Sequence, residues 1–139
     1  MAELTEEQLK TIVEIAKRLD TSLMRLLRHE EPWTLTAAAG TNLRLFNRVS
    51  TNRILVITHM SAYNAISACT RIRLGYWSRS RYNWARIVPA PLVLETVEFN
   101  GELVLTEDMW PAIQFEGCSK DDDLFGVVQG YWIAIPRIS

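Results

Sequence analysis

Residues 92–106 read Leu-Val-Leu-Glu-Thr-Val-Glu-Phe-Asn-Gly-Glu-Leu-Val-Leu-Thr, and this stretch carries the strongest short signal for the fold. Asn100 and Gly101 separate two runs that are rich in β-branched and apolar residues. Because both residues tolerate a positive φ, an Asn-Gly pair in this setting is typical of a hairpin turn. The stretch therefore predicts two antiparallel strands. A two-residue loop and a bulged three-residue loop each leave an apolar residue opposite Val97, so the register of the hairpin stays open.

Further strands are expected on both sides of this hairpin. Met109–Phe115 and Leu124–Ile135 follow it, and the apolar run Ile54–Ile57 precedes it as a buried strand. Ile66–Leu74 ends in an alternation of arginine with apolar residues. At roughly five to eight residues a strand, residues 43–135 have room for about eight strands. The expected fold is mainly β, an N-terminal amphipathic helix followed by an antiparallel β-sandwich.

The N-terminal helix is expected over residues 4–28. Thr5-Glu-Glu-Gln8 fits a capping box, in which the side chains of Thr5 and Gln8 each bond the backbone amide of the other. Pro32 bounds the helix. We therefore divide the chain into a helix (1–31), an extended connector (32–42) and the β-sandwich domain (43–139).

Apolar residues repeat along this helix at spacings of three and four, which is the pattern of a heptad seam. The seam consists of Leu9, Ile12, Ala16, Leu19, Leu23 and Leu26. Such a stripe either packs on the protein's own sheet or meets other chains as an interface, and the sequence leaves both alternatives open.

Charge is segregated along the chain, although the formal net charge is only −1. Residues 32–94 contain eight arginines and no acid, whereas residues 95–139 contain nine acids and two bases. Either strands from the two blocks pair, so that opposite charges interleave on one sheet, or basic and acidic faces of neighbouring copies meet.

Arginine and aromatic residues alternate between residues 71 and 86. The candidate interface residues of this stretch are Tyr76, Trp77, Arg79, Arg81, Tyr82 and Trp84. Tyrosine, tryptophan and arginine are enriched at protein interfaces, so a protein partner is favoured. A single-stranded nucleic acid is the alternative partner, because guanidinium groups bind phosphate and rings stack on bases, and Arg71 and Arg73 would then contribute. Closure of the hydrophobic core is the third interpretation.

The sequence contains no recognisable catalytic or metal-binding motif. His29 and His59 have no third ligand at zinc spacing, and Asp121-Asp-Asp123 lacks the spaced oxygens of a calcium loop. Cys69 and Cys118 are interpreted as small apolar fillers rather than a disulfide. We expect no enzyme activity and no cofactor.

Composition excludes several other classes of protein. The content of apolar residues, 48%, and of charged residues, 22%, is that of a globular domain. No apolar run approaches the roughly 20 residues that span a bilayer, so no membrane partner is expected. The acidic N-terminus lacks the basic and apolar regions of a signal peptide, which predicts synthesis in a cytoplasm.

In the order of their sequence features, residues 53–135 resemble the small jelly-roll-like β-sandwich proteins of tailed bacteriophage virions. The resemblance is carried by Arg53-Ile-Leu-Val-Ile-Thr58, the hairpin around Asn100, Ala112-Ile-Gln-Phe-Glu-Gly117 and Phe125-Gly-Val-Val-Gln-Gly-Tyr-Trp-Ile133. It implies a structural virion protein made in the host cytoplasm, at the head as a decoration protein, at the neck as a head-tail connector, or in the tail. Its expected partners are further copies of itself, in a ring or trimer, and other virion proteins.

Overall fold

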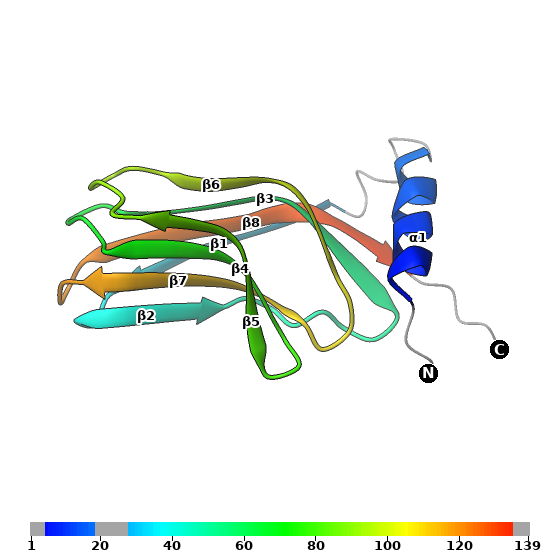
Figure 1. Cartoon of the computed structure of the whole chain (residues 1–139), viewed down its shortest axis with the longest axis horizontal. Coiled ribbons are helices and arrows are strands. Elements are labelled where there is room, and N and C mark those ends of the chain that lie inside the picture. Colours follow the sequence, from blue (N-terminus) through cyan, green and yellow to red (C-terminus); the bar gives the residue numbers. More distant parts are fainter. Residues whose placement is uncertain (1–4, 19–27, 135–139) are drawn as a thin grey trace.

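The computed structural model describes residues 5–18 and 28–134. Within these ranges the chain forms one helix and eight strands (Figure 1). They are α1 (Glu6–Arg18), β1 (Arg28–Thr36), β2 (Gly40–Leu45), β3 (Arg53–Asn64), β4 (Arg71–Ser78), β5 (Arg81–Pro89), β6 (Val97–Leu105), β7 (Trp110–Cys118) and β8 (Asp123–Ala134).

The strands pair as one long hairpin that has been rolled up. All pairs are antiparallel: β1 with β8, β2 with β7, β3 with β6 and β4 with β5. Two further pairings, β3 with β8 and β4 with β7, complete sheet A (β1-β8-β3-β6) and sheet B (β2-β7-β4-β5). Eight strands connected in this way form a jelly roll. The β-sandwich predicted from the sequence is therefore confirmed.

The turn of this long hairpin lies at Arg79 and Ser80, whose φ angles are 51° and 61°. Two central residues with positive φ make a type I′ turn, which matches the twist of the flanking strands. The hairpin predicted at Asn100-Gly101 is wrong. Neither of these residues has a positive φ, and β6 runs through both while it pairs with β3, with a bulge opposite Thr58. Pairing with a distant strand has thus overridden the local turn preference.

Residues 32–42 are not an extended connector, because β1, a tight turn and β2 occupy them. The turn is tied to the β7–β8 loop by two backbone hydrogen bonds, from the Ala37 amide to the Asp122 carbonyl and from the Asp121 amide to the Ala37 carbonyl. Pro32 fits in β1 because β1 is an edge strand of sheet A. The sandwich therefore begins at Arg28, before residue 43.

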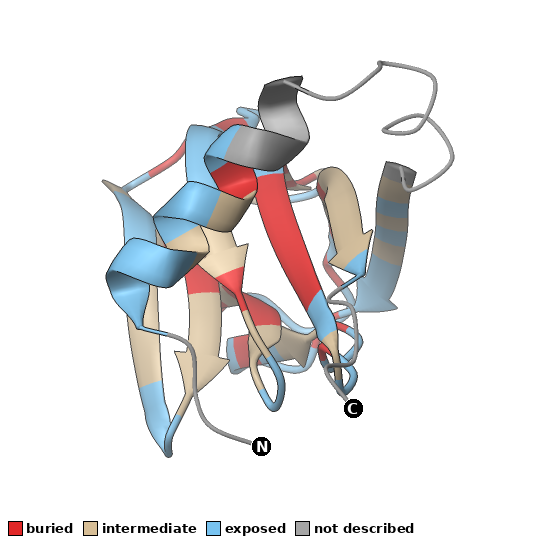
Figure 2. Ribbon diagram, turned by 90° about the vertical axis from the view of Figure 1, so that its right-hand side faces the viewer, coloured by how far each residue is buried: buried red, intermediate tan, exposed pale blue. Residues whose placement is uncertain are grey.

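The main core lies between the two sheets. Figure 2 marks the buried residues in red. Its largest fully buried side chains include Leu55, Ile57, Met60, Ile72, Leu74, Leu105, Ile113, Phe115 and Leu124. On sheet A, Leu55 and Ile57 point into this core, so Ile54 and Val56 point to the opposite, outer face of the sheet.

Helix α1 covers that outer face at one end of the sandwich (Figures 1 and 2). Val13 is 1% exposed and packs with Ile54 and Val56, which are completely buried. The predicted capping box is confirmed, with the Thr5 amide donating to Gln8 Oε1 at 2.8 Å and the Gln8 amide donating to Thr5 Oγ1 at 3.1 Å. The predicted extent to residue 28 is wrong, since Arg28 already belongs to β1.

Candidate functional site

The aromatic residues of the β4–β5 hairpin stack on one another on the outer face of sheet B. Tyr82 lies between the other two rings. Its ring centroid is 4.5 Å from that of Trp77, at an interplanar angle of 60°, and 5.2 Å from that of Trp84, at 6°. All three side chains are partly exposed. The three rings therefore support each other and remain partly accessible to solvent.

Charged residues continue this row across sheet B. The Arg73 guanidinium lies 6.0 Å from the centroid of the Trp84 ring, and its Nη2 is 3.1 Å from Glu116 Oε1. Arg71 Nη1 lies 3.4 Å from the other oxygen of Glu116. We call these six residues the ladder: Trp77, Tyr82, Trp84, Arg73, Glu116 and Arg71.

Backbone geometry explains why the ladder can form. In β4, Ile72 and Leu74 face the core, so Arg71 and Arg73 face outward. Gly75 lies opposite Trp84, and a Cβ at Gly75 would collide with the carbonyl oxygen of Asn83. The pairing of β4 with β5 shifts register between Leu74 and Gly75, and the β4–β5 hairpin bends away from the rest of the sandwich (Figure 1). The absence of a side chain at Gly75 therefore permits the close approach of β5 on which the ring stack depends.

Three of the six candidate residues of this stretch meet in the ladder, namely Trp77, Tyr82 and Trp84. Tyr76 is directed the other way and packs against the core. Arg79 lies in the turn, and Arg81 is exposed beside it at the start of β5.

The sequence interpretation missed the role of Glu116. Its contacts with Arg71 and Arg73 depend on the register of β4 with β7, which joins residues 45 positions apart. The alternation of Arg71 and Arg73 with apolar residues was the available signal, but it does not name the partner. At this site arginines of the basic block and an acid of the acidic block interleave on one sheet, which was one of the two interpretations of the charge segregation.

The first part of the heptad seam packs on the protein's own sheet. Leu9 and Ile12 contact the cluster of Val13, Ile54 and Val56. The side chain of Ala16, and the whole of Leu19, Leu23 and Leu26, lie outside the described residues. For the described part of the helix, the alternative of packing on its own sheet is the one observed.

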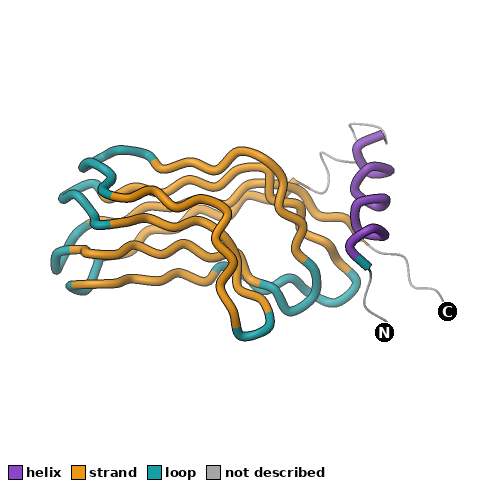
Figure 3. Tube along the Cα trace, viewed as in Figure 1, coloured by secondary structure: helices purple, strands orange, loops and turns teal. Residues whose placement is uncertain are grey.

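The end of the sandwich far from α1 carries exposed apolar side chains on two loops (Figure 3). These are Ile66 in the β3–β4 loop and Leu92, Val93 and Leu94 in the β5–β6 loop, and we call them the apolar tip. The Leu94 amide donates to the Asn64 carbonyl oxygen at 2.8 Å, while the Ile66 amide donates to Asn64 Oδ1 at 2.9 Å. Asn64 therefore holds both loops together.

A buried carboxylate lies beneath the tip. Asp122 is 2% exposed, and its Oδ2 accepts hydrogen bonds from Ser67 Oγ at 2.5 Å, from the Ser119 amide at 2.8 Å and from Asn64 Nδ2 at 2.9 Å. Burial by itself raises the pKa of Asp122, but the three hydrogen bonds outweigh burial and leave the pKa lowered. The carboxylate thus stays charged and ties the β3–β4 loop to the β7–β8 loop.

The two cysteines are buried next to each other and are free. Cys69 Sγ and Cys118 Sγ are 4.0 Å apart. Burial, reinforced by Cys69, raises the pKa of the Cys118 thiol to about 12. A thiol with such a pKa is a poor nucleophile at neutral pH, in keeping with a packing role.

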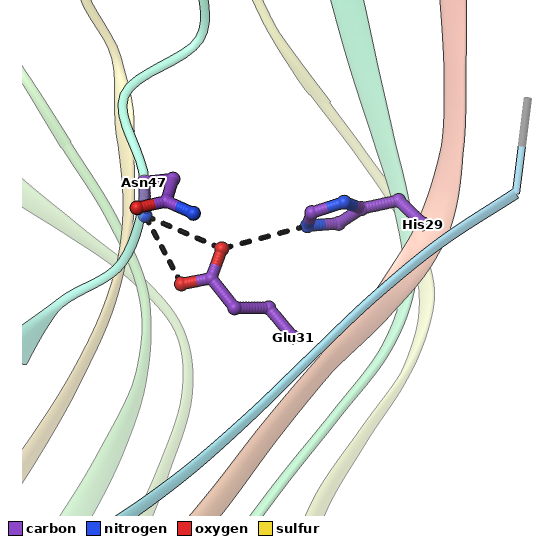
Figure 4. Close-up of polar contacts among 3 residues, drawn as sticks. All are labelled: His29, Glu31 and Asn47. Carbon is purple, nitrogen blue, oxygen red and sulfur yellow. Dashed lines mark hydrogen bonds and ion pairs between the residues drawn. The ribbon is translucent and has the colours of Figure 1, made fainter.

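The histidines lie in separate polar contacts. His29 is in β1, and its Nε2 is 3.7 Å from Glu31 Oε1 (Figure 4). Glu31 also accepts hydrogen bonds from the Asn47 amide, which closes the edge of the sandwich between β1 and the segment after β2. Burial lowers the pKa of His29, with Glu31 acting in the opposite direction. His59 Nδ1 lies 2.8 Å from Asn100 Oδ1.

Metal and ligand sites find little support in the same part of the chain. Among residues 5–18 and 28–134, no three His, Cys, Asp or Glu side chains gather in a way that could hold a metal ion. A hollow of about 170 Å³ lies on sheet A beside the stacked rings of Tyr63 and Phe125. It is smaller than the roughly 300–1,000 Å³ of typical ligand pockets.

Within the described ranges, no helix has the length and apolar character needed to cross a membrane.

Comparison with known proteins gives likeness at the level of fold. No family model matches the chain, and no curated protein matches it. A solved structure from the appendages of Bacillus endospores, described as a novel family of disulfide-linked pili, shares 11% identity with a TM-score of 0.45, over 79% of this chain and 88% of that one. The core of Drosophila NLP, described in terms of pentamer formation and histone binding, shares 12% identity with a TM-score of 0.40, over 75% of this chain and 96% of that one. With TM-scores below 0.5, these likenesses say nothing about function.

Proposed function

We propose that the protein is a non-enzymatic structural subunit, which associates with further copies of itself and docks on a larger assembly. The ladder is the observation that carries this proposal. It places two tryptophans, a tyrosine and two arginines in one partly exposed row on a rigid sheet. These are the residue types that dominate binding energy at protein interfaces, and prior stacking reduces the entropy that binding would cost.

The edges of the two sheets favour contact through faces rather than by strand addition. An unprotected edge strand tends to pair with another chain. Here β1 contains Pro32, β2 is short with a register shift near Thr41, and β6 has a bulge opposite Thr58. On β5, Arg81 and Arg86 are exposed and Pro89 ends the strand. Each edge therefore carries a feature that opposes pairing, which leaves the faces as the surfaces for assembly.

Single-stranded nucleic acid is less well supported by the same geometry. Binding of bases needs ring faces that are open for stacking. One face of Tyr82 is stacked on Trp84, the Trp77 ring packs against Tyr82 at a tilt, and Arg73 lies over the Trp84 ring. Arg71 and Arg73 are both paired with Glu116. The ladder is thus better suited to contact with another folded protein surface than to binding of a single-stranded nucleic acid.

A tailed-phage virion is the assembly that we propose. Its support is the resemblance of residues 53–135 to small jelly-roll-like virion proteins, together with the observed jelly-roll connectivity. If the protein is a virion component, a specific antibody should detect it in purified phage virions. Failure to detect it in any purified virion would contradict this proposal.

A pair of matched variants tests the role of the ladder. Tyr82→Ser removes the middle ring of the ladder, whereas Tyr63→Ser removes a ring that stacks on Phe125, at a centroid distance of 4.9 Å, on the other sheet. Both tyrosines are partly exposed, so we expect similar losses of stability. Light scattering should show an oligomer for the wild type and for Tyr63→Ser, and a monomer for Tyr82→Ser. A wild-type protein that stays monomeric throughout a dilution series would overturn the proposal.

Electrophoretic mobility shift with mixed single-stranded DNA and RNA tests the alternative. The proposal predicts no shift at physiological salt. A tight shift that weakens steeply as salt rises, as phosphate contacts require, would favour the nucleic-acid function instead.

A further inference from the structure

The apolar tip is exposed to an extent that its packing does not explain. Leu92 is 68% exposed, Leu94 62%, Ile66 58% and Val93 45%. Single exposed apolar residues are normal, but four on two adjoining loops form a patch, and such patches mark interaction sites. The two loops are joined through Asn64, so the patch has a fixed shape.

The backbone of the tip is held in a strained conformation. Leu94 has φ +63°, which lies in the left-handed region that is unfavourable for a residue with a Cβ. The Leu94 amide is bonded to the Asn64 carbonyl, the Glu95 amide to the Leu92 carbonyl, and the Leu92 amide to Glu95 Oε1. Strain of this kind persists where surrounding interactions, here these hydrogen bonds, hold the backbone in place. In this conformation Leu92 and Leu94 are directed toward solvent.

Charges around the tip and around the ladder have opposite signs. The tip is bordered by exposed Glu95, Asp121 and Asp123, and the nearby bases are Lys120 and the partly exposed Arg71. The ladder contains Arg71 and Arg73 against one acid, Glu116. Arg79, Arg81 and Arg86 add positive charge to the same hairpin, with Arg81 and Arg86 on the other face of β5. An acidic apolar surface and a basic aromatic surface are therefore complementary in charge and in polarity.

The rings of the ladder and the apolar tip lie at opposite ends of β5, because Tyr82 and Trp84 are near its start and the loop that carries Leu92 follows its end. Arg71, at the other end of the ladder, lies opposite Pro89. The tip of a chain consequently does not reach the rings of its own ladder. A second copy can offer its ladder to this tip while its own tip remains available.

We propose that the apolar tip of one copy docks on the ladder of a second copy. This inference rests on the proposed self-association and names the two surfaces that make it. The contact is heterologous, since the surface on one copy differs from the surface on the other. Repetition of such a contact gives a ring if the rotation closes and an open filament if it does not.

Two variants that each disable one surface test the contact. The tip variant is Leu92→Ser with Leu94→Ser, and the ladder variant is Ile87→Glu, which places an acid beside Arg73 on the face of β5 that carries the ladder. Leu92, Leu94 and Ile87 are all exposed, so both variants should keep the unfolding midpoint of the wild type. Lys10→Glu, an exposed charge change on α1, is the control for reversal of charge away from both surfaces.

A head-to-tail contact makes a specific prediction for mixtures. Each variant alone should be monomeric in sedimentation velocity, because each lacks one half of the contact. An equimolar mixture should form a 1:1 heterodimer of twice the 16.0 kDa chain mass and nothing larger, since one intact tip and one intact ladder remain. The wild type and Lys10→Glu should form larger oligomers that loosen as salt is raised.

Every other outcome overturns the inference in a distinct way. If only the ladder variant is monomeric and the mixture gives no heterodimer, ladders meet each other across a two-fold axis. If only the tip variant is monomeric, tips meet each other. If both variants assemble as the wild type does, the contact lies elsewhere, although self-association stands. A monomeric wild type removes the proposed function itself.

Discussion

Substitution of Asp122 by alanine should weaken the sandwich far more than substitution of the exposed acids on either side of it. The Asp122 carboxylate accepts three hydrogen bonds on one oxygen, from Asn64, Ser67 and Ser119, and it is 2% exposed. An unpaired buried donor costs about 1–3 kcal/mol, and donors nearer the surface cost less because water can reach them. Asn64 is also buried, whereas Ser67 is partly exposed.

We therefore expect Asp122→Ala to lower the free energy of unfolding by about 3 kcal/mol, after allowance for the relief of burying a charge. Urea denaturation measures this change. Asp123→Ala, an exposed neighbour at the start of β8, is the control and should stay within about 0.5 kcal/mol of the wild type.

Acid should remove the same contribution. Because the pKa of Asp122 is lowered in the folded protein, its contribution is complete above the unfolded value of about 3.9 and is lost as the pH falls through the folded pKa. Asp122→Ala should therefore show a shallower loss of stability in strong acid. A variant as stable as the wild type at neutral pH would refute the assignment of Asp122 as the residue that ties the loops.

Three further predictions concern the turn, the edge and the helix. Replacement of Arg79-Ser80 by Asn-Gly should raise the free energy of unfolding by about 1 kcal/mol, because both positions have positive φ, and a lower stability would contradict the type I′ assignment. Stability should fall as the pH drops below about 6.5, since the lowered pKa of His29 means that the unfolded chain takes up a proton first; His29→Gln should flatten this slope in thermal melts, and an unchanged slope would show that other groups cause it. Val13→Asp should cost at least about 2 kcal/mol in urea denaturation, because Val13 is 1% exposed; an unchanged midpoint with loss of assembly would show instead that α1 serves a partner.

The class of fold could be predicted from the sequence because it depends on local apolar patterns. The apolar run at Ile54–Ile57 lies in β3, and the runs after Met109 and Leu124 lie in β7 and β8. The capping box around Thr5 likewise depends on residues three positions apart, and it formed as predicted.

The connectivity could not be predicted, because it is set by pairing between distant strands. Asn100-Gly101 has the stronger local preference for a turn, yet Arg79-Ser80 makes the central turn of the rolled hairpin. β6 gains a long partner in β3 by running straight through Asn100. A hairpin at Asn100 would forgo that pairing, so the tertiary contacts decide against the local preference.

The candidate site was predictable in composition but not in arrangement. Spacing along the chain singled out Trp77, Tyr82 and Trp84, and alternation on β4 and β5 explains why they share one face. Tyr76 faces the core because the β-strand period of two places it opposite to its neighbour. Glu116 required the register of β7, which no local pattern reveals.

Photo-crosslinking tests most directly whether the ladder is a contact surface between copies of the protein. A photoreactive amino acid in place of Ile87, which is 47% exposed on β5, would sit beside Arg73 on the face that carries the ladder. A mixture of ¹⁵N-labelled and unlabelled protein then distinguishes crosslinks between copies from those within one chain. We predict crosslinks between copies, with the β5–β6 loop of the second chain as the captured segment. Crosslinks confined to a single chain, under conditions in which the protein is oligomeric, would contradict the claim.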